Sequence, residues 1–258
     1  MNSPSYFSTT IEKGMAIMGL FDRDHTRRNL TEISKITGIN KTSTFRFINT
    51  LVNLGYLKKC NNSKLIKLGP KSLLLGHNVI QGNDLLQGVK SLIDKTFYEF
   101  GITIDSALLD DCKLISLYRR ESSNIIHLRL PPVMEDLYAR ALGKAVLAHI
   151  SESDLSRYLD RMPMKMLTPK TLVRREVLLA DLNLTRDRGY SINNEEYMIG
   201  LICIGAPLIN YQTKSVMGAV SLDFLSSEQS VESIQKNYIG ILTKVAGEIS
   251  EAITMLDN

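Results

Sequence analysis

The segment from residue 41 to residue 49 carries side chains whose types and spacing suit contact with nucleic acid. If this segment is a helix, residues three and four positions apart share one face. That face and the adjoining first turn carry hydroxyl, aromatic, cationic and amide groups: Lys41, Thr42, Ser43, Phe45, Arg46 and Asn49. Arg and Lys bind guanine or phosphate, Asn pairs with adenine, and Thr offers hydroxyl contacts. An ordinary solvated helix face has a similar composition, so the surrounding elements must decide.

The other reactive side chains lack a spacing that would support catalysis or metal binding. The three cysteines, Cys60, Cys112 and Cys203, are far apart, and no Cys/His spacing suggests zinc. Their odd number argues against a disulfide framework and is typical of a reducing cytoplasm. No P-loop, dinucleotide fingerprint or nucleophile elbow is present. The histidines lie in segments that place no base beside Cys203, so a Cys203-dependent enzyme is the less favoured alternative. No cofactor or metal is expected.

Two short helices joined by a tight turn are predicted around residues 41–49. Asn29 with Glu32 has the spacing of a capping box, and Gly38 is suited to end the first helix in the left-handed conformation. Asn40 can cap the second helix, which we expect to end at Gly55. Its buried face is predicted from apolar spacing at Thr44, Phe47, Ile48 and Leu51. This is the pattern of a helix-turn-helix with residues 41–49 on the recognition helix.

A β-hairpin is predicted directly after the second helix. Residues 56–60 and 64–68 read as short strands around a polar turn. A hairpin in this place is a wing, and the lysines Lys58, Lys59 and Lys64 could position it by contacting phosphates. The alternative is that these lysines only contribute to solubility.

The charge distribution supports two parts with different partners. The chain has 258 residues and a net charge of +4. Residues 1–80 contain 12 Lys and Arg against 4 Asp and Glu, whereas residues 81–258 are acidic overall. A basic part suggests a polyanionic partner, although chance clustering is the simpler alternative. No apolar run reaches the length of a membrane span, so no membrane partner is expected.

The rest of the chain is predicted to be α+β. A helix over 70–83 is expected to link the parts, and residues 102–109, 112–119 and 125–130 form adjacent strands with short turns. Helices are predicted at 84–100, 141–150, 152–160, 174–188 and 227–256, and further strands at 202–209 and 215–224. The expected domains are a winged helix-turn-helix over 9–69, a linker helix over 70–83, and a second domain over 84–258.

Ordered motifs along both parts resemble the IclR-type bacterial transcription regulators. The resemblance covers roughly residues 10–250 and rests on the segments Leu30–Leu57, Leu68–Gly69, Ala141–Ala145, Thr168–Thr171, Arg188–Ser191, Glu195–Glu196 and Gly200–Pro207. It implies a GAF/PAS-like second domain with an antiparallel sheet that binds a small effector. It also implies a homodimer formed through the N-terminal domain or a homotetramer formed through the C-terminal one.

The resemblance also implies which residues line the effector pocket. Carried over by motif, these are Ala141, Leu142, Gly143, Asn194, Cys203, Ser221 and Asp223. The helix start at residue 141 could bind an anion through its free N–H groups. Arg140 stands where the family usually has a small residue, and it could grip a carboxylate, point to solvent, or pair with Glu135 or Asp136. Arg140 favours a carboxylate, whereas Asp223 favours a hydroxylated or cationic group. We therefore expect the effector to be an organic acid or a hydroxylated metabolite. Cys203 could equally be an ordinary core thiol.

These patterns and the resemblance predict an effector-responsive transcription regulator that controls catabolic or metabolic genes. A repressor is favoured, and an activator of the same family is the alternative. As a dimer it would read a palindromic double-stranded operator with half-sites about 34–36 Å apart. An architectural DNA binder without an effector is a further alternative, disfavoured by the size of the second domain.

Overall fold

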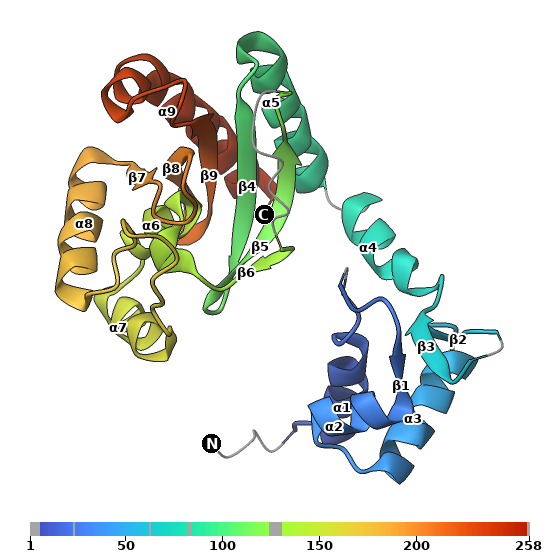
Figure 1. Cartoon of the computed structure of the whole chain (residues 1–258). Helices are drawn as coiled ribbons and strands as arrows, with labels where there is room; N and C mark the ends of the chain where they lie inside the picture. The colour runs from blue at the N-terminus through green and yellow to red at the C-terminus, as the bar shows by residue number, and fades with distance from the viewer. Residues whose placement is uncertain (1–5, 23, 62, 82–83, 124–130, 257–258) are drawn as a thin grey trace. The chain divides into compact units, whose positions relative to one another are not determined.

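The computed structural model describes residues 6–22, 24–61, 63–81, 84–123 and 131–256. The chain divides into two compact units, residues 1–83 and 84–258. Figure 1 shows the helical character of the first unit and the sheet that organises the second. Within the described residues, no helix is both long enough and apolar enough to span a bilayer.

The first unit is a helix-turn-helix followed by a small antiparallel sheet. Its elements in chain order are α1 (Thr9–Met18), β1 (Arg28–Asn29), α2 (Leu30–Thr37), α3 (Lys41–Asn53), β2 (Leu57–Lys59), β3 (Leu65–Leu68) and α4 (Ser72–Gln81). The predicted hairpin is β2 and β3, and β1 adds a third strand beside β3 that the sequence reading did not anticipate. The unit is therefore a winged helix-turn-helix.

Local capping sets the turn between α2 and α3. Asn29 and Glu32 form the predicted capping box, with both side chain to backbone distances at 3.0 Å. Gly38 takes the left-handed conformation with φ of 70°, and the Asn40 side chain accepts from the Ser43 N–H at 2.9 Å. The turn is thus short and specified by hydrogen bonds, which holds α3 at a defined angle to α2.

The second unit is built on a six-stranded antiparallel sheet with the order β6-β5-β4-β9-β8-β7. The strands are β4 (Thr103–Asp110), β5 (Lys113–Arg120), β6 (Val133–Met134), β7 (Ser191–Asn194), β8 (Leu201–Ile209) and β9 (Val216–Leu225). Two of them, β6 and β7, are short edge strands that the apolar pattern did not predict. The strand predicted at 125–130 lies outside the described residues.

Helices cover both faces of this sheet. They are α5 (Asp84–Phe100), the 3-10 turn η1 (Leu137–Ala139), α6 (Ala141–Leu147), α7 (Glu152–Arg161), α8 (Arg175–Arg188) and α9 (Val231–Leu256). One apolar core joins α5 and α9 to the sheet, and a second core lies under α6, α7 and α8. The sheet is therefore the middle layer of three.

Alternation along the central strands divides these two layers cleanly. Even-numbered residues on β4, β8 and β9 point to the α5/α9 core: Ile104, Ile202, Ile204, Val220, Leu222 and Phe224. Odd-numbered residues point to the α6 side, where polar groups replace the apolar ones: Asp105, Cys203, Ser221 and Asp223. A polar region thus lies on the α6 side of an otherwise apolar sheet.

Candidate functional site

The outer face of α3 is an exposed cationic surface. Lys41, Thr42, Phe45 and Arg46 are exposed, while Asn49 is half-buried at the margin of the face. Ser43 is also half-buried, and its N–H donates to the Asn40 side chain that caps the helix. Among the described residues, no carboxylate forms an ion pair with either of the two cations. This surface can therefore offer charge and hydrogen-bond donors to an external partner.

The wing contributes further cations, one of which reaches the α3 face. The Lys59 Nζ donates to the Asn49 Oδ1 at 2.9 Å and lies 5.9 Å from the centroid of the Phe45 ring. Lys58 and Lys64 are exposed on the hairpin. The structure thus brings Lys59 together with Phe45 and Asn49. The Asn49 Oδ1 must release the Lys59 Nζ before it can accept a hydrogen bond from a base edge.

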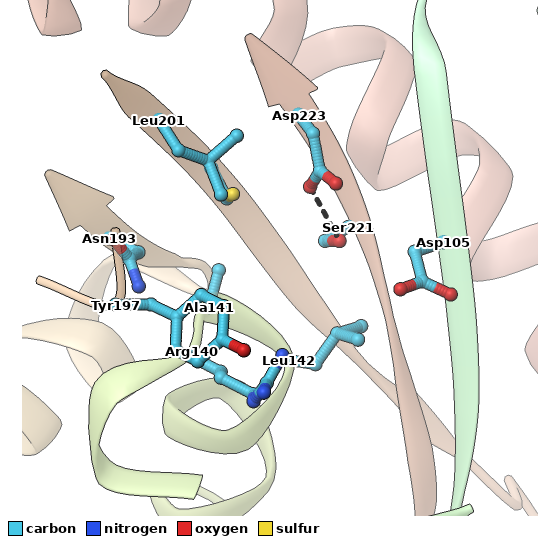
Figure 2. Close-up of a pocket in the computed structure, with 10 residues that line it drawn as sticks. Asp105, Arg140, Ala141, Leu142, Asn193, Tyr197, Leu201, Ser221 and Asp223 are labelled. Carbon is cyan, nitrogen blue, oxygen red and sulfur yellow. Dashed lines mark hydrogen bonds between the residues drawn. The ribbon is translucent and has the colours of Figure 1, made fainter. Parts of the chain in front are cut away.

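A buried polar cavity lies on the α6 side of the sheet in the second unit (Figure 2). The space enclosed by the cavity is about 30 Å³. The walls come from β4, β7, β8, β9, the start of α6 and the segment after β7: Asp105, Arg140, Ala141, Leu142, Asn193, Tyr197, Leu201, Cys203, Ser221 and Asp223. Polar and apolar side chains therefore both surround this small space, a mixture that is usual for ligand sites.

Arg119 on β5 joins the two carboxylates of this cavity. Its Nη1 lies 2.7 Å from the Asp223 Oδ2 and 3.3 Å from the Asp105 Oδ2, and its Nε donates to Glu121 at 2.9 Å. The Ser221 hydroxyl donates to the Asp223 Oδ1 at 3.0 Å. Burial raises the pKa of Asp105 to about 7, with a further increase from Asp223 and an opposing effect of Arg119. This wall of the cavity therefore contains two interacting carboxyl groups, of which Asp105 is only partly ionised near neutral pH.

Arg140 closes the other side of the cavity and is bound within the protein. Its Nε donates to the Asp136 Oδ1 at 2.6 Å and its Nη2 to the Asp136 Oδ2 at 3.2 Å, a bidentate pair. The guanidinium also stacks 3.7 Å from the centroid of the Tyr197 ring. Of the arrangements that the sequence left open, the structure shows pairing with Asp136. Glu135 instead pairs with Lys113.

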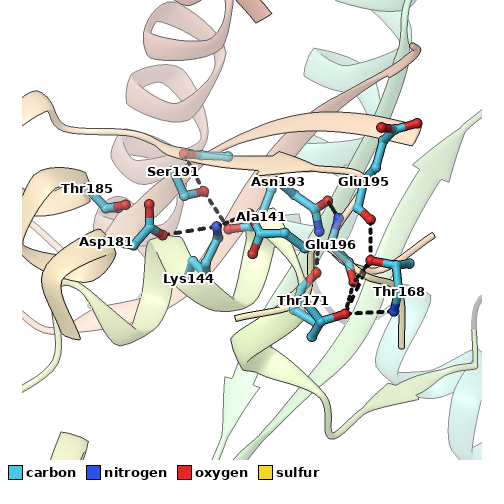
Figure 3. A network of polar contacts seen from close by, with 12 residues as sticks. Ala141, Lys144, Thr168, Thr171, Asp181, Thr185, Ser191, Asn193, Glu195 and Glu196 are labelled. Atoms are coloured by element: carbon cyan, nitrogen blue, oxygen red, sulfur yellow. Dashed lines mark hydrogen bonds and ion pairs between the residues drawn. The ribbon is translucent and has the colours of Figure 1, made fainter. Parts of the chain in front are cut away.

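A polar network behind the cavity holds its wall in place (Figure 3). The buried Lys144 of α6 lies 2.7 Å from the Glu196 Oε1 and 3.0 Å from the Asp181 Oδ2. Thr171 donates to the Glu196 carbonyl at 2.7 Å, and Asn193 accepts from the Glu196 N–H at 3.0 Å. Because Tyr197 directly follows Glu196, this network positions the ring that stacks on Arg140.

Cys203 is a poor candidate for a nucleophile. Its side chain is buried, and burial together with the nearby Asp223 raises the pKa of the thiol well above its usual value. A thiol in this state is protonated and weakly reactive. Within the described ranges, no group of three or more His, Cys, Asp or Glu side chains is arranged to hold a metal ion. The cavity is therefore suited to binding rather than to thiol or metal chemistry.

Two family models match consecutive parts of the chain. The model described as "Bacterial transcriptional regulator IclR C-terminal" matches residues 77–251, and the "IclR helix-turn-helix domain" matches residues 10–59. The chain belongs to the IclR family. It is therefore a transcription regulator with a helix-turn-helix DNA-binding part and a C-terminal effector-binding domain, and not an enzyme.

Individual relatives agree with this family assignment. The chain is 29% identical over 224 residues to the HTH-type transcriptional regulator XynR of Escherichia coli (strain K12), covering 84% of this chain and 86% of the relative. It is 26% identical to the Transcriptional repressor IclR of the same organism over 83% of this chain and 78% of that one. The fold is also that of an IclR homolog complexed with 4-hydroxybenzoate from Microbacterium hydrocarbonoxydans, with a TM-score of 0.79, 18% identity and coverage of 95% and 98%.

Most residues carried over from the IclR pattern lie together in the cavity wall. These are Ala141, Leu142, Cys203, Ser221 and Asp223, and Arg140, which departs from that pattern, lies beside them. Gly143 does not line the cavity. A Cβ at Gly143 would lie 2.1 Å from the Leu137 carbonyl oxygen, so this glycine permits η1 to pack closely against α6. Asn194 also lies outside the wall, and its neighbour Asn193 lines the cavity because successive strand residues point to opposite faces.

The reading by IclR motifs missed Asp105, Asn193, Tyr197 and Leu201 in the cavity wall, and Arg119 behind it. The sequence contains a signal for two of these residues, Asp105 and Arg119. Asp105 and Arg119 are charged residues inside segments that were predicted as strands of a core sheet, where an ionisable side chain is normally paired. Their pairing with each other follows from direct opposition in the β4–β5 register.

Proposed function

We propose that this IclR-family chain is a repressor whose affinity for a palindromic operator changes when a small organic acid or hydroxylated metabolite binds in the cavity of residues 84–258. It would act as a homodimer or homotetramer in the cytoplasm and control catabolic or metabolic genes. One observation carries the proposal: an exposed cationic helix face and a buried polar cavity lie in two separate units of one chain.

The DNA-binding half of the proposal rests on the α3 face and the wing. Arg46 and Lys41 are exposed on α3, and Lys58, Lys59 and Lys64 are exposed on the wing. Exposed cations without an acidic partner bind phosphates and release counterions, which makes affinity strongly dependent on salt. Base readout is assigned to the α3 side chains and phosphate contact to the wing lysines, since α-helices fit the major groove.

The effector half rests on the polar composition of the cavity. Asp105, Ser221 and Asp223 place hydrogen-bonding groups on one wall, and Arg140 places a cation on the other. A ligand that bound equally well in all states would not change operator affinity. The effector must therefore prefer one arrangement of the DNA-binding units, and the coupling between effector and operator is reciprocal.

The experiment measures binding of the intact protein to DNA from the region beside its own gene by fluorescence anisotropy across a salt series. Arg46→Ala removes one cation from the α3 face. Lys236→Ala is the matched control, because it removes one cation from an exposed position on α9. We expect a loss of about 1–3 kcal/mol, or roughly 5- to 150-fold in affinity, for Arg46→Ala.

The control variant should bind like the parent protein. Equal binding by both variants would remove Arg46 from the DNA interface and contradict the assignment of α3. A reporter fused to the same region gives the sign of regulation, because deletion of a repressor raises expression and deletion of an activator lowers it.

A further inference from the structure

One buried acceptor in the cavity wall has no partner within the protein. Asp105 is 1% exposed, and among the described residues nothing donates a hydrogen bond to its Oδ1. Figure 2 shows the carboxyl group directed from β4 toward the space between Ser221 and Leu142. An unpaired buried acceptor bears the full cost of its desolvation, so such atoms are rare and require a partner. Asp105 therefore offers an acceptor to a molecule in the cavity.

Asp223 is less free than Asp105 to provide this contact, although the sequence made it the more obvious choice. Its Oδ1 accepts from Ser221 at 3.0 Å and its Oδ2 from Arg119 at 2.7 Å. Both oxygens are thus engaged within the protein. The Asp105 Oδ2 has only the longer contact of 3.3 Å to Arg119, and its Oδ1 remains available.

The guanidinium next to Asp105 holds a complementary unpaired donor. The Arg119 Nη2 is buried and, within the described part of the chain, donates to no acceptor. Asp105 and Arg119 are directly opposite on β4 and β5, so their side chains share a face of the sheet. One cross-strand pair therefore holds two buried polar atoms without a partner among the described residues. Arg119 lies behind the cavity wall and Asp105 lines it, so the Asp105 Oδ1 is the atom that a ligand can reach. A hydroxyl can donate to this oxygen, whereas a carboxylate only accepts.

We propose that Asp105 selects an alcohol hydroxyl of the effector, which donates to the Asp105 Oδ1. The effector class is then a polyol or a hydroxy acid, which share this alcohol group. The inference rests on the proposed effector role of the cavity. A cationic group is disfavoured because the two carboxyl groups of this wall already pair with Arg119, so a buried ammonium would bear the desolvation cost of its charge without an unpaired counter-charge.

The state of the carboxyl group agrees with a neutral partner. Burial raises the pKa of Asp105 to about 7, so both of its protonation forms are present near neutral pH. A hydroxyl donates to the carboxylate and accepts from the carboxylic acid, so it can pair with either form. An ammonium pairs only with the ionised form.

The first test compares ligands of one carbon skeleton by thermal shift and titration calorimetry on the intact protein. The probes are gluconate, sorbitol, hexanoate and 6-aminohexanoate. We expect gluconate or sorbitol to bind, and hexanoate and 6-aminohexanoate to bind at least tenfold more weakly. Asp105→Asn should weaken the hydroxylated probe about tenfold, because it replaces a charge-assisted hydrogen bond by a neutral one. Asp110→Asn, the same change at the exposed end of β4, is the matched control and should leave binding unchanged.

A second test does not depend on the size of the natural effector. Protein labelled with ¹³C at the aspartate carboxyl groups is titrated with glycerol and, separately, with ethylammonium. The Asp105 resonance is assigned by its loss in Asp105→Asn. We expect glycerol to move this resonance in a saturable way, and ethylammonium to leave it in place.

The outcomes separate this inference from the proposed function. Equal or tighter binding of hexanoate or 6-aminohexanoate, or an Asp105 resonance that glycerol does not move, overturns hydroxyl selection by Asp105. Neither result bears on operator binding, which is measured without any probe. Loss of operator binding in the Arg46→Ala comparison is likewise independent of the Asp105 resonance, so the two failures are distinguishable.

Discussion

Lys144→Met removes the cation from the network that supports the cavity wall. Lys144 is fully buried, and its Nζ lies 2.7 Å from Glu196 and 3.0 Å from Asp181. Methionine fills a similar volume without charge. The Glu196 side chain is only 9% exposed and would be left without its counter-charge, whereas Asp181 can still reach solvent. Breaking a buried pair by removing one partner costs about 3–5 kcal/mol.

For a unit of this size, that cost corresponds to a Tm lowered by about 6–20 °C. Calorimetry of the intact protein measures the transition of the unit that contains residues 84–258. Lys170→Met is the matched control because Lys170 forms an exposed ion pair with the adjacent Glu195. Exposed pairs contribute about 0–1 kcal/mol, so the control should remain close to the parent protein.

Two further results are expected if the unpaired charge of Glu196 causes the loss of stability. Lys144→Met combined with Glu196→Gln should recover much of the lost stability, because glutamine carries no charge to be left unpaired. Burial already raises the pKa of Glu196, and loss of Lys144 raises it further, so the single variant should lose more stability at pH 8 than at pH 5. A loss below about 1 kcal/mol, or strictly additive effects in the double variant, would refute the reasoning.

Two other changes test the packing and the electrostatics of the same unit. Gly143→Ala should lower the free energy of unfolding by about 1–3 kcal/mol or more, since the new Cβ would meet the Leu137 backbone at 2.1 Å. Gly240→Ala on α9 is the control. Because the space around Gly240 is open, calorimetry should show this change to be neutral or stabilising. Asp105→Asn should change the pH dependence of unfolding. In the parent protein the carboxyl pKa rises from about 3.9 unfolded to about 7 folded, so its contribution to stability falls between these pH values and levels off above the folded pKa. Urea unfolding from pH 4 to pH 8 should therefore show the variant gaining stability relative to the parent as pH rises; a constant difference would contradict the burial of an ionising carboxyl at this position.

Much of the structure of the first unit could be predicted from interactions between residues that are close in the sequence. The capping box at Asn29, the left-handed Gly38 and the apolar spacing of α3 are interactions within a few residues, so their geometry is readable from the sequence. The long elements of the second unit were predicted from periodicity for the same reason. The short strands β1, β6 and β7 have no periodicity to detect, because they exist only through pairing with a neighbour.

The cavity could be predicted only in part because its polar groups meet through long-range register. Motif resemblance located Ser221 and Asp223, but the contact of Asp223 with Arg119 spans 104 residues. Which of two adjacent asparagines faces inward also depends on the pairing of β7 with β8. A one-residue shift in register would exchange Asn193 and Asn194, and the apolar pattern of so short a strand does not specify it.

The alternation of β4, β8 and β9 has a consequence for how this protein can change over evolutionary time. Residues that hold the sheet to α5 and α9 and residues that contact a ligand occupy different faces of the same strands. Mutations at ligand-facing positions such as Ser221 therefore leave the opposite core intact. Successive residues of one strand are thus constrained by contacts in different layers of the domain. Changes of ligand preference at these positions are therefore limited by the polar network of the cavity wall and not by the packing of the sheet against α5 and α9.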